Sequence, residues 1–363
     1  MIKLIQSFFY FFRYLFFINN VDVLFYAPQH FNRSNNNNLF FEPLIQACKK
    51  NNIKYIFFEE PVFSSSSCRN NFAIPFDFIF YIILILRRLS LTDRLIGKIL
   101  RHTFLKNLKF KNYIVLSQSL IEFFKGVNPE AVFFDLQHGI IHSNKPNYIL
   151  NGRPTKNLIE YDIQLLLTGK GYKELLTKSD LSGYFRNKSH VVGSSLVYEN
   201  VFLHNKPNNC ILVTLQFTDD HSKNQNINLL NELEIVIDSN PHYIFYLRNH
   251  PRYNNEVDSS ILENKENTRW SPSNFKDCLK LCSIHLTAYS TSVFECASYG
   301  IPTLFLVSLK NDFNMFSTDF SYPLENNLDS IKENYLDNRF ILKDWFSEFY
   351  VNFDERMFIS LLK

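Results

Sequence analysis

Short apolar runs alternate with longer segments of helical spacing along most of the chain. In the first half, the apolar runs are rich in Val, Ile, Phe and Tyr, as strands are, and they fall at residues 21–27, 54–58, 112–116, 131–135, 164–167 and 190–192. Apolar residues at helical spacing lie between them, at residues 40–51, 119–125 and 172–178. Continuous apolar strands separated by helices are typical of a parallel sheet that is covered on both faces.

The same alternation begins again after residues 203–209, a polar stretch without periodicity. The second half predicts strands at residues 210–215, 243–247, 284–287 and 303–307, and helices at residues 229–238, 275–282 and 292–299. The chain is helical in its spacing again from residue 331 onward. We therefore predict an α/β fold with two doubly wound Rossmann-like domains facing across a cleft. The predicted boundaries are residues 1–206 and 207–340, followed by a helical tail at 341–363.

Composition narrows the classes of function. The length of 363 residues suits two domains, and the net charge of +3 gives no support for a nucleic-acid partner. Neither G-x-x-x-x-G-K-[ST] nor G-x-G-x-x-G occurs, which argues against a P-loop NTPase and a standard dinucleotide-binding enzyme. The six cysteines include no C-x-x-C pair and predict reduced thiols in a cytosolic protein. We expect no cofactor.

Polar residues that follow a predicted strand are candidates for a site, because ligands of open parallel sheets bind beyond the C-terminal ends of the strands. In the first half, a strand ends in Asp135 and is followed by Gln137, His138 and Gly139. A histidine there can take a proton from a hydroxyl nucleophile near neutral pH, and Asp135 can orient the imidazole or help to bind an acceptor. We predict His138 and Asp135 as catalytic residues, and Gln137 and His142 as acceptor-binding residues. A structural turn histidine, held by the backbone, is the alternative for His138.

Two further strand ends in the second half carry groups that suit a phosphate. One predicted strand is followed by Arg248 and His250, which can hold phosphate through charge-assisted hydrogen bonds. Another leads to Ser290, Thr291 and Ser292 at the start of a predicted helix. Ser290 and Ser292 are candidates for the N-cap, and a helix N-terminus presents free N–H groups to a phosphate. Together these residues predict a phosphate clamp in the second domain.

The order strand, His250-Pro251, helix, strand and S-T-S-V-F-E-C-A-S-Y-G-I-P-T resembles the donor-binding half of bacterial GT-B glycosyltransferases that build O-antigen, capsule and lipooligosaccharide. In the sialyltransferase and Kdo-transferase branches, an HP motif and a Ser/Thr-rich motif hold the CMP portion of the donor. The resemblance covers about residues 130–310. It implies that a nucleotide-sugar donor, with a CMP-sugar as one candidate, is bound by Arg248, His250, Ser290, Thr291, Ser292 and Glu295. Sialyltransferases of this type carry an acidic-acidic-Gly motif, where this chain has Gln137-His138-Gly139.

The resemblance implies a glycosyltransferase that moves a sugar to a glycan or lipid-linked acceptor in surface-polysaccharide synthesis. No Asp-x-Asp triplet occurs, and Gly139 argues against a helical zinc pair of His138 and His142. We therefore expect a reaction that needs no metal. Deprotonation of the acceptor hydroxyl by His138 favours an inverting single displacement. A teichoic-acid-type polyol-phosphate transferase, a nucleotide-sugar 2-epimerase and a non-catalytic scaffold of a polysaccharide synthesis complex remain as alternatives.

Apolar and basic residues gather in the N-terminal half. Residues 1–18 carry only Lys3 and Arg13 as charges, and this run is too short for a transmembrane helix. It suits the membrane interface or a first helix packed on the domain. The apolar residues 78–86 precede eight basic residues and one acidic residue within a stretch of 25. That pattern predicts docking on an anionic membrane surface, with a solvated helix face as the alternative. We expect a cytoplasmic protein, peripheral on the inner face of the plasma membrane.

Overall fold

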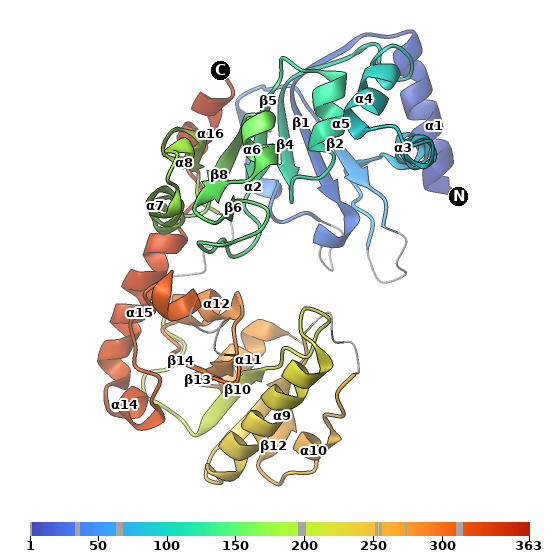
Figure 1. Ribbon diagram of the computed structural model, residues 1–363. Helices are drawn as coiled ribbons and strands as arrows, with labels where there is room; N and C mark the ends of the chain where they lie inside the picture. Colours follow the sequence, from blue (N-terminus) through green and yellow to red (C-terminus); the bar gives the residue numbers. More distant parts are fainter. Residues whose placement is uncertain are drawn as a thin grey trace. The chain divides into compact units, whose positions relative to one another are not determined.

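The chain forms two compact units. The computed structural model describes residues 2–32, 37–62, 68–194, 201–250, 253, 256–272, 274–309 and 315–363. Unit 1 comprises Met1–Leu196 together with Tyr350–Lys363, and unit 2 comprises Val197–Phe349 (Figure 1). The sequence placed the boundary after residue 206 and kept residues 341–363 together. In the structure the division falls after Leu196, and the chain returns to unit 1 at Tyr350.

Unit 1 is built on a sheet of seven strands, all of which are parallel. From one edge to the other, these strands are β3 (Ile74–Pro75), β2 (Tyr55–Glu60), β1 (Asn19–Pro28), β4 (Leu108–Leu116), β5 (Val132–Leu136), β8 (Ile163–Leu167) and β9 (Ser189–Val191). A small antiparallel pair, β6 (Ile149–Leu150) and β7 (Arg153–Pro154), lies between β5 and β8 in the sequence. The strand order reverses between β1 and β4, which is the switch point where ligands of such sheets bind.

Helices cover both faces of this sheet. On one face α2 (Glu42–Lys50) packs with α16 (Glu355–Leu361), and Phe25, Phe41 and Phe358 share one buried cluster there. Tyr26 is the next residue of β1 and faces the other side, where its ring lies 5.3 Å from those of Phe76 and Phe124. The other helices of unit 1 are α1 (Ile2–Phe12), α3 (Asp77–Arg88), α4 (Asp93–Arg101), α5 (Ile121–Val127), α6 (Lys156–Glu160), α7 (Lys170–Ser179) and α8 (Tyr184–Lys188).

The helices α4 and α5 meet at two glycines. A Cβ atom added to Gly97 would lie 2.1 Å from the backbone oxygen of Phe123, and one added to Gly126 would lie 2.2 Å from the backbone oxygen of Arg94. Carbon and oxygen atoms do not approach so closely without a bond. The two helix backbones are therefore in direct contact, and neither position has room for a side chain.

Unit 2 contains a second parallel sheet, of five strands. In spatial order they are β12 (Thr268–Trp270), β11 (Ile244–Arg248), β10 (Cys210–Thr214), β13 (Ile284–Thr287) and β14 (Thr303–Phe305). The first strand of the unit lies in the middle and the order reverses between β10 and β13, as in a Rossmann-like sheet. The helices of this unit whose bounds lie within the described residues are α9 (Lys223–Asp238), α10 (Ser260–Glu263), α11 (Phe275–Leu281), α12 (Ser292–Ser298), α14 (Leu328–Glu333) and α15 (Tyr335–Phe349).

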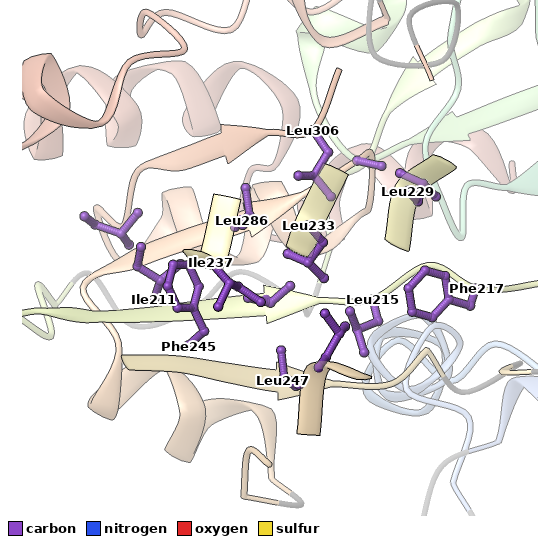
Figure 2. Packing of buried hydrophobic residues seen from close by; sticks show 14 of the residues in the cluster. Ile211, Leu215, Phe217, Leu229, Leu233, Ile237, Phe245, Leu247, Leu286 and Leu306 are labelled. Carbon is purple, nitrogen blue, oxygen red and sulfur yellow. The ribbon is translucent and has the colours of Figure 1, made fainter. Parts of the chain in front are cut away.

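Successive residues of β10 face opposite sides of this second sheet. Ile211 belongs to a buried cluster with Leu229 and Leu233 of α9, as Figure 2 shows. Leu212 belongs to another buried cluster, which includes Cys278 of α11 and Cys296 of α12. Both faces of the sheet are therefore covered, and the predicted doubly wound fold is confirmed for each unit. Among the described residues, no helix is long and apolar enough to cross a membrane.

Candidate functional site

The turn that carries His138 is fixed by its neighbour Gln137. The Oε1 atom of Gln137 accepts hydrogen bonds from the backbone N–H (3.0 Å) and the hydroxyl (3.1 Å) of Thr168, and its Nε2 donates to the backbone oxygen of Gly139 (2.9 Å). These bonds tie the end of β5 to the residue after β8. Gln137 is buried. We conclude that Gln137 holds the turn in place.

The imidazole of His138 lies in an aromatic environment. Its ring centroid is 4.8 Å from that of Phe31 and 6.5 Å from that of Phe40. Burial lowers the pKa of His138 to about 4, because phenyl rings cannot solvate an imidazolium ion. The buried Nδ1 has no hydrogen-bond partner in the part of the chain that the structure describes. The expectation that His138 titrates near neutrality is therefore wrong, and the ring is neutral at pH 7.

Asp135, at the end of β5, has its own partners. Its Oδ2 accepts a hydrogen bond from the Tyr148 hydroxyl (2.9 Å) and its Oδ1 accepts one from the backbone N–H of Gln118 (3.3 Å). Burial raises the pKa of Asp135 to about 7. The sequence suggested that Asp135 orients the imidazole of His138, but within the described ranges no hydrogen bond joins the two side chains. The carboxyl group instead links β5 to the residues that follow β4.

His142 lies further along the same loop and is half-buried. Its Nδ1 accepts a hydrogen bond from the backbone N–H of Asn144, at 3.4 Å. No three His, Cys, Asp or Glu side chains within the described ranges are arranged so that they could hold a metal ion.

In unit 2, Arg248 is the last residue of β11. Its Nη1 donates a hydrogen bond to the backbone oxygen of Pro272 (2.9 Å), and its guanidinium carbon lies 5.5 Å from the centroid of the Phe275 ring. These contacts orient the side chain toward α11. His250 lies two residues further on and is half-buried, with its backbone oxygen accepting from the N–H of Tyr253 (3.0 Å). Pro251 lies outside the described residues.

The start of α12 differs in detail from the prediction. Thr291 occupies the N-cap position without a capping hydrogen bond from its side chain, so the assignment of Ser290 or Ser292 as N-cap is wrong by one residue. The Oγ of Ser290 accepts from the backbone N–H of Ser292 (3.2 Å). Thr291 is exposed and Glu295, on the same helix, is half-buried. The three hydroxyls thus share one turn but have different surroundings.

Ser292 reaches a buried polar network beneath this turn. Its Oγ lies 3.4 Å from both Thr214 Oγ1 and the Nε2 of His285. His285 is fully buried in β13, with Nε2 2.9 Å from Thr214 Oγ1 and Nδ1 3.0 Å from Thr303 Oγ1. Burial lowers the pKa of His285 to about 3, so this ring is also neutral. The network holds β10, β13 and β14 in register under the start of α12.

Sequence reasoning missed three polar residues at the switch point of unit 2, namely Gln216, His221 and Tyr289. The Oε1 of Gln216, just after β10, accepts the backbone N–H of Tyr289 (2.7 Å), which follows β13. His221 hydrogen-bonds through Nε2 to the Tyr289 hydroxyl, and its Nδ1 lies 3.1 Å from Asn226 Oδ1. The strand-end rule that led to His138 would have selected Gln216 and His221 if it had been applied to the strand at residues 210–215.

Comparisons with known proteins support the fold. No protein-family model and no curated protein matches the sequence. Among solved structures, the chain is similar to S. aureus MnaA, determined with UDP, at 12% identity and a TM-score of 0.52, covering 95% of each chain. It is also similar to a Listeria monocytogenes protein assigned as a UDP-N-acetylglucosamine 2-epimerase, at 12% identity and a TM-score of 0.53, covering 94% of this chain and 95% of that one. The fold, with two Rossmann-like units, is therefore of the GT-B type.

Proposed function

We propose that the chain is a glycosyltransferase that moves a sugar from a nucleotide-activated donor to a glycan or lipid-linked acceptor in bacterial surface-polysaccharide synthesis. The observation that carries the proposal is the chemistry at the strand ends. A neutral histidine, His138, follows β5 in unit 1. In unit 2, Arg248 ends β11, His250 follows it, and hydroxyl groups follow β13. The similar S. aureus structure was determined with UDP, which supports a nucleotide as the ligand of this fold. The motif residues His250 and Ser290 favour a CMP-sugar as the donor.

The proposed reaction is a single displacement. The acceptor oxygen attacks the anomeric carbon of the donor sugar and gives its proton to His138. The bond from that carbon to the phosphate oxygen breaks, and the nucleotide leaves with the electron pair. Because the attack comes from the side opposite the leaving group, the configuration inverts. Arg248, His250 and the hydroxyls of Ser290 and Thr291 would stabilise the charge that develops on the leaving phosphate.

Transfer assays test this proposal against its alternatives. Radiolabelled CMP-, UDP- and GDP-sugars and CDP-glycerol are incubated with the protein and a membrane extract, and label is followed into lipid and polysaccharide. Incorporation of sugar supports the glycosyltransferase. Incorporation of glycerol phosphate would assign a polyol-phosphate transferase instead, and isomerisation of UDP-N-acetylglucosamine without an acceptor would assign an epimerase. A thermal-shift measurement with the same nucleotides tests the scaffold alternative. If none of the nucleotides raises the melting temperature of the protein, the chain is a scaffold.

Replacing His250 by alanine should weaken nucleotide binding. A charge-assisted contact to phosphate contributes about 1.5–3 kcal/mol, so the dissociation constant should rise by about 10-fold or more. Isothermal titration with CMP and UDP measures the change. His242→Ala is a matched control, because His242 is exposed and precedes the same strand, β11, at its opposite end. Unchanged nucleotide affinity in folded His250→Ala protein would remove His250 from the donor site.

We propose that unit 1 also docks on the inner face of the plasma membrane. Phe9 on α1 and Phe16 and Phe17 just after it are between 66% and 69% exposed. The helices α1 and α3 pack together (Figure 1), and Ile85 and Leu89 add exposed apolar area at the end of α3. Aromatic and aliphatic side chains on helices that do not span a membrane suit the headgroup region. A surface of this kind favours a transferase with a lipid-linked acceptor over an epimerase, whose substrates are soluble.

The basic patch beside this surface consists of the eight basic residues within residues 87–111. Its net positive charge is smaller than the sequence suggested. Three of its cations form ion pairs with carboxylates, two of which lie outside the stretch: Arg87 with Asp93 (2.6 Å), Arg94 with Glu160 (3.8 Å) and Lys111 with Asp22 (2.8 Å). Arg88 and Arg101 are exposed at the ends of α3 and α4. Apolar contact should therefore contribute more to membrane binding than charge does.

Replacing Phe9, Phe16 and Phe17 by serine should release the protein from vesicles that contain phosphatidylglycerol. Full burial of a Phe side chain contributes about 1.5–3 kcal/mol, so loss of three partly buried rings should weaken binding by at least about tenfold. Cosedimentation at low and high salt measures the binding. A control variant carries serine at Leu336, Phe340 and Ile341, exposed residues of α15 in unit 2. If the wild-type protein does not sediment with these vesicles, the apolar surface has another partner.

A further inference from the structure

Unit 1 contains a cavity of about 430 Å³ that none of the candidate site residues lines. One wall is a face of α2, formed by residues at helical spacing: Glu42, Ile45, Gln46 and Lys49. The other described residues of its lining come from β2 and from the segments before α2 and β3: Asn37, Asn38, Tyr55, Phe57, Asn70 and Phe72. The volume lies within the range of small-molecule binding sites, and it exceeds the space that one sugar ring occupies.

The described part of the lining combines amides with aromatic rings and has no net formal charge. It holds four amide side chains, each with a donor and an acceptor, and three aromatic rings, and the only two charges among these described residues, those of Glu42 and Lys49, are opposite. A nucleotide or another anion would need a surplus of cations. A wholly apolar ligand would leave amide groups without hydrogen-bond partners. A sugar ring satisfies both kinds of wall, because its hydroxyls pair with amides while its C–H faces pack on aromatic rings.

Two asparagines shape the wall of the cavity. Asn38 is only 4% exposed. Its Oδ1 accepts from the backbone N–H of Phe41 (3.1 Å), whereas its Nδ2 has no hydrogen-bond partner in the described part of the chain. Asn70 uses its Oδ1 to accept from the backbone N–H of Phe72 (2.8 Å) and of Ala73 (3.2 Å). That turn presents the Phe72 ring, which is 82% exposed, at the rim of the cavity.

We propose that this cavity binds an uncharged sugar unit of a polysaccharide. Gln46 would hydrogen-bond a hydroxyl of the sugar, and Phe72 would cover one face of its ring. Binding here needs neither a nucleotide donor nor transfer, so the proposal can fail or succeed separately from the proposed enzymatic function.

Ligand-observed saturation-transfer NMR on the full chain tests the cavity with three neutral probes: maltohexaose, mannohexaose and chitohexaose. We expect saturation transfer from the protein to at least one of these oligosaccharides. Its affinity should fall at least about fivefold in Phe72→Ala and in Gln46→Ala, and should stay unchanged in Phe17→Ala, which removes an exposed ring outside the cavity. Absence of transfer to all three probes, or equal binding by the wild-type protein and both cavity variants, would overturn the proposal. Tighter binding of a sialic acid hexamer would overturn the uncharged ligand class.

Discussion

Replacing His138 by alanine should lower the rate of sugar transfer by roughly 10²–10⁴-fold, the usual contribution of a general base. The imidazole is neutral at pH 7 because burial beside Phe31 lowers its pKa to about 4. It is therefore in the deprotonated form that a base requires, and the same low pKa makes it a weak base. Donor affinity should be almost unchanged, since the predicted donor residues belong to unit 2. Steady-state transfer and nucleotide titration measure the two effects. His102→Ala, at an exposed position after α4, is the control.

The pH profile separates His138 from its neighbour Asp135. A base is active when it is deprotonated, so with His138 as base the rate should be flat between roughly pH 6 and 8 and fall only as the pH drops toward 4. Burial raises the pKa of Asp135 to about 7, and a reaction that used this carboxylate would lose rate as the pH falls through 7. That second profile, or turnover that survives in His138→Ala, would assign the base to Asp135 and a structural role to His138.

Substitution of Gly97 by alanine should destabilise unit 1 by about 2–4 kcal/mol. In an exposed helix the same substitution ordinarily stabilises by about 1 kcal/mol. Here the new methyl group would lie 2.1 Å from the backbone oxygen of Phe123 and 3.0 Å from the Cα of Gly126. Because the contacting atoms belong to the backbone, they cannot rotate away as a side chain could, and α4 and α5 must move apart. Gly126→Ala should have a similar cost for the reciprocal reason.

Urea unfolding measures this effect, and the chain offers a built-in reporter. Both tryptophans, Trp270 and Trp345, belong to unit 2, so their fluorescence follows that unit while circular dichroism follows both. Gly97→Ala should lower the midpoint of the dichroism transition. Gly139→Ala is the matched control, because an added methyl group there meets no atom within 4 Å. An unchanged midpoint in Gly97→Ala would mean that the two helices can move apart at little cost.

All ten strands predicted from the sequence are present, and the reason lies in their burial. Central strands such as β10 are apolar on both faces, so they stand out as continuous apolar runs. Two short edge strands, β12 and β3, carry no such signal. In β12, Arg269 and Trp270 are exposed, and β3 consists only of Ile74 and Pro75. The hairpin of β6 and β7 was missed because each of its strands has two residues.

The sequence placed the candidate residues at strand ends, but it could not give their partners. The carboxyl group of Asp135 meets Tyr148, 13 residues away, and His138 meets Phe31 from the end of β1. Only the completed sheet brings these segments together. The pKa of each group depends on such neighbours, so the neutral histidine and the raised pKa of Asp135 were beyond sequence reasoning. The predicted donor residues of unit 2 stay a prediction, because their contacts to a donor also depend on neighbours that the sequence does not give.

The return of the chain to unit 1 has a consequence for its synthesis. Phe358 of α16 fills the same core as Phe25, and Glu355 pairs with Lys50 of α2 at 2.9 Å. On the ribosome, all of unit 2 is therefore translated before unit 1 receives its last helix, although unit 1 is begun first. A premature stop codon anywhere in residues 197–349 thus damages both units, because it removes α16 from the core of a unit whose remaining sequence is intact.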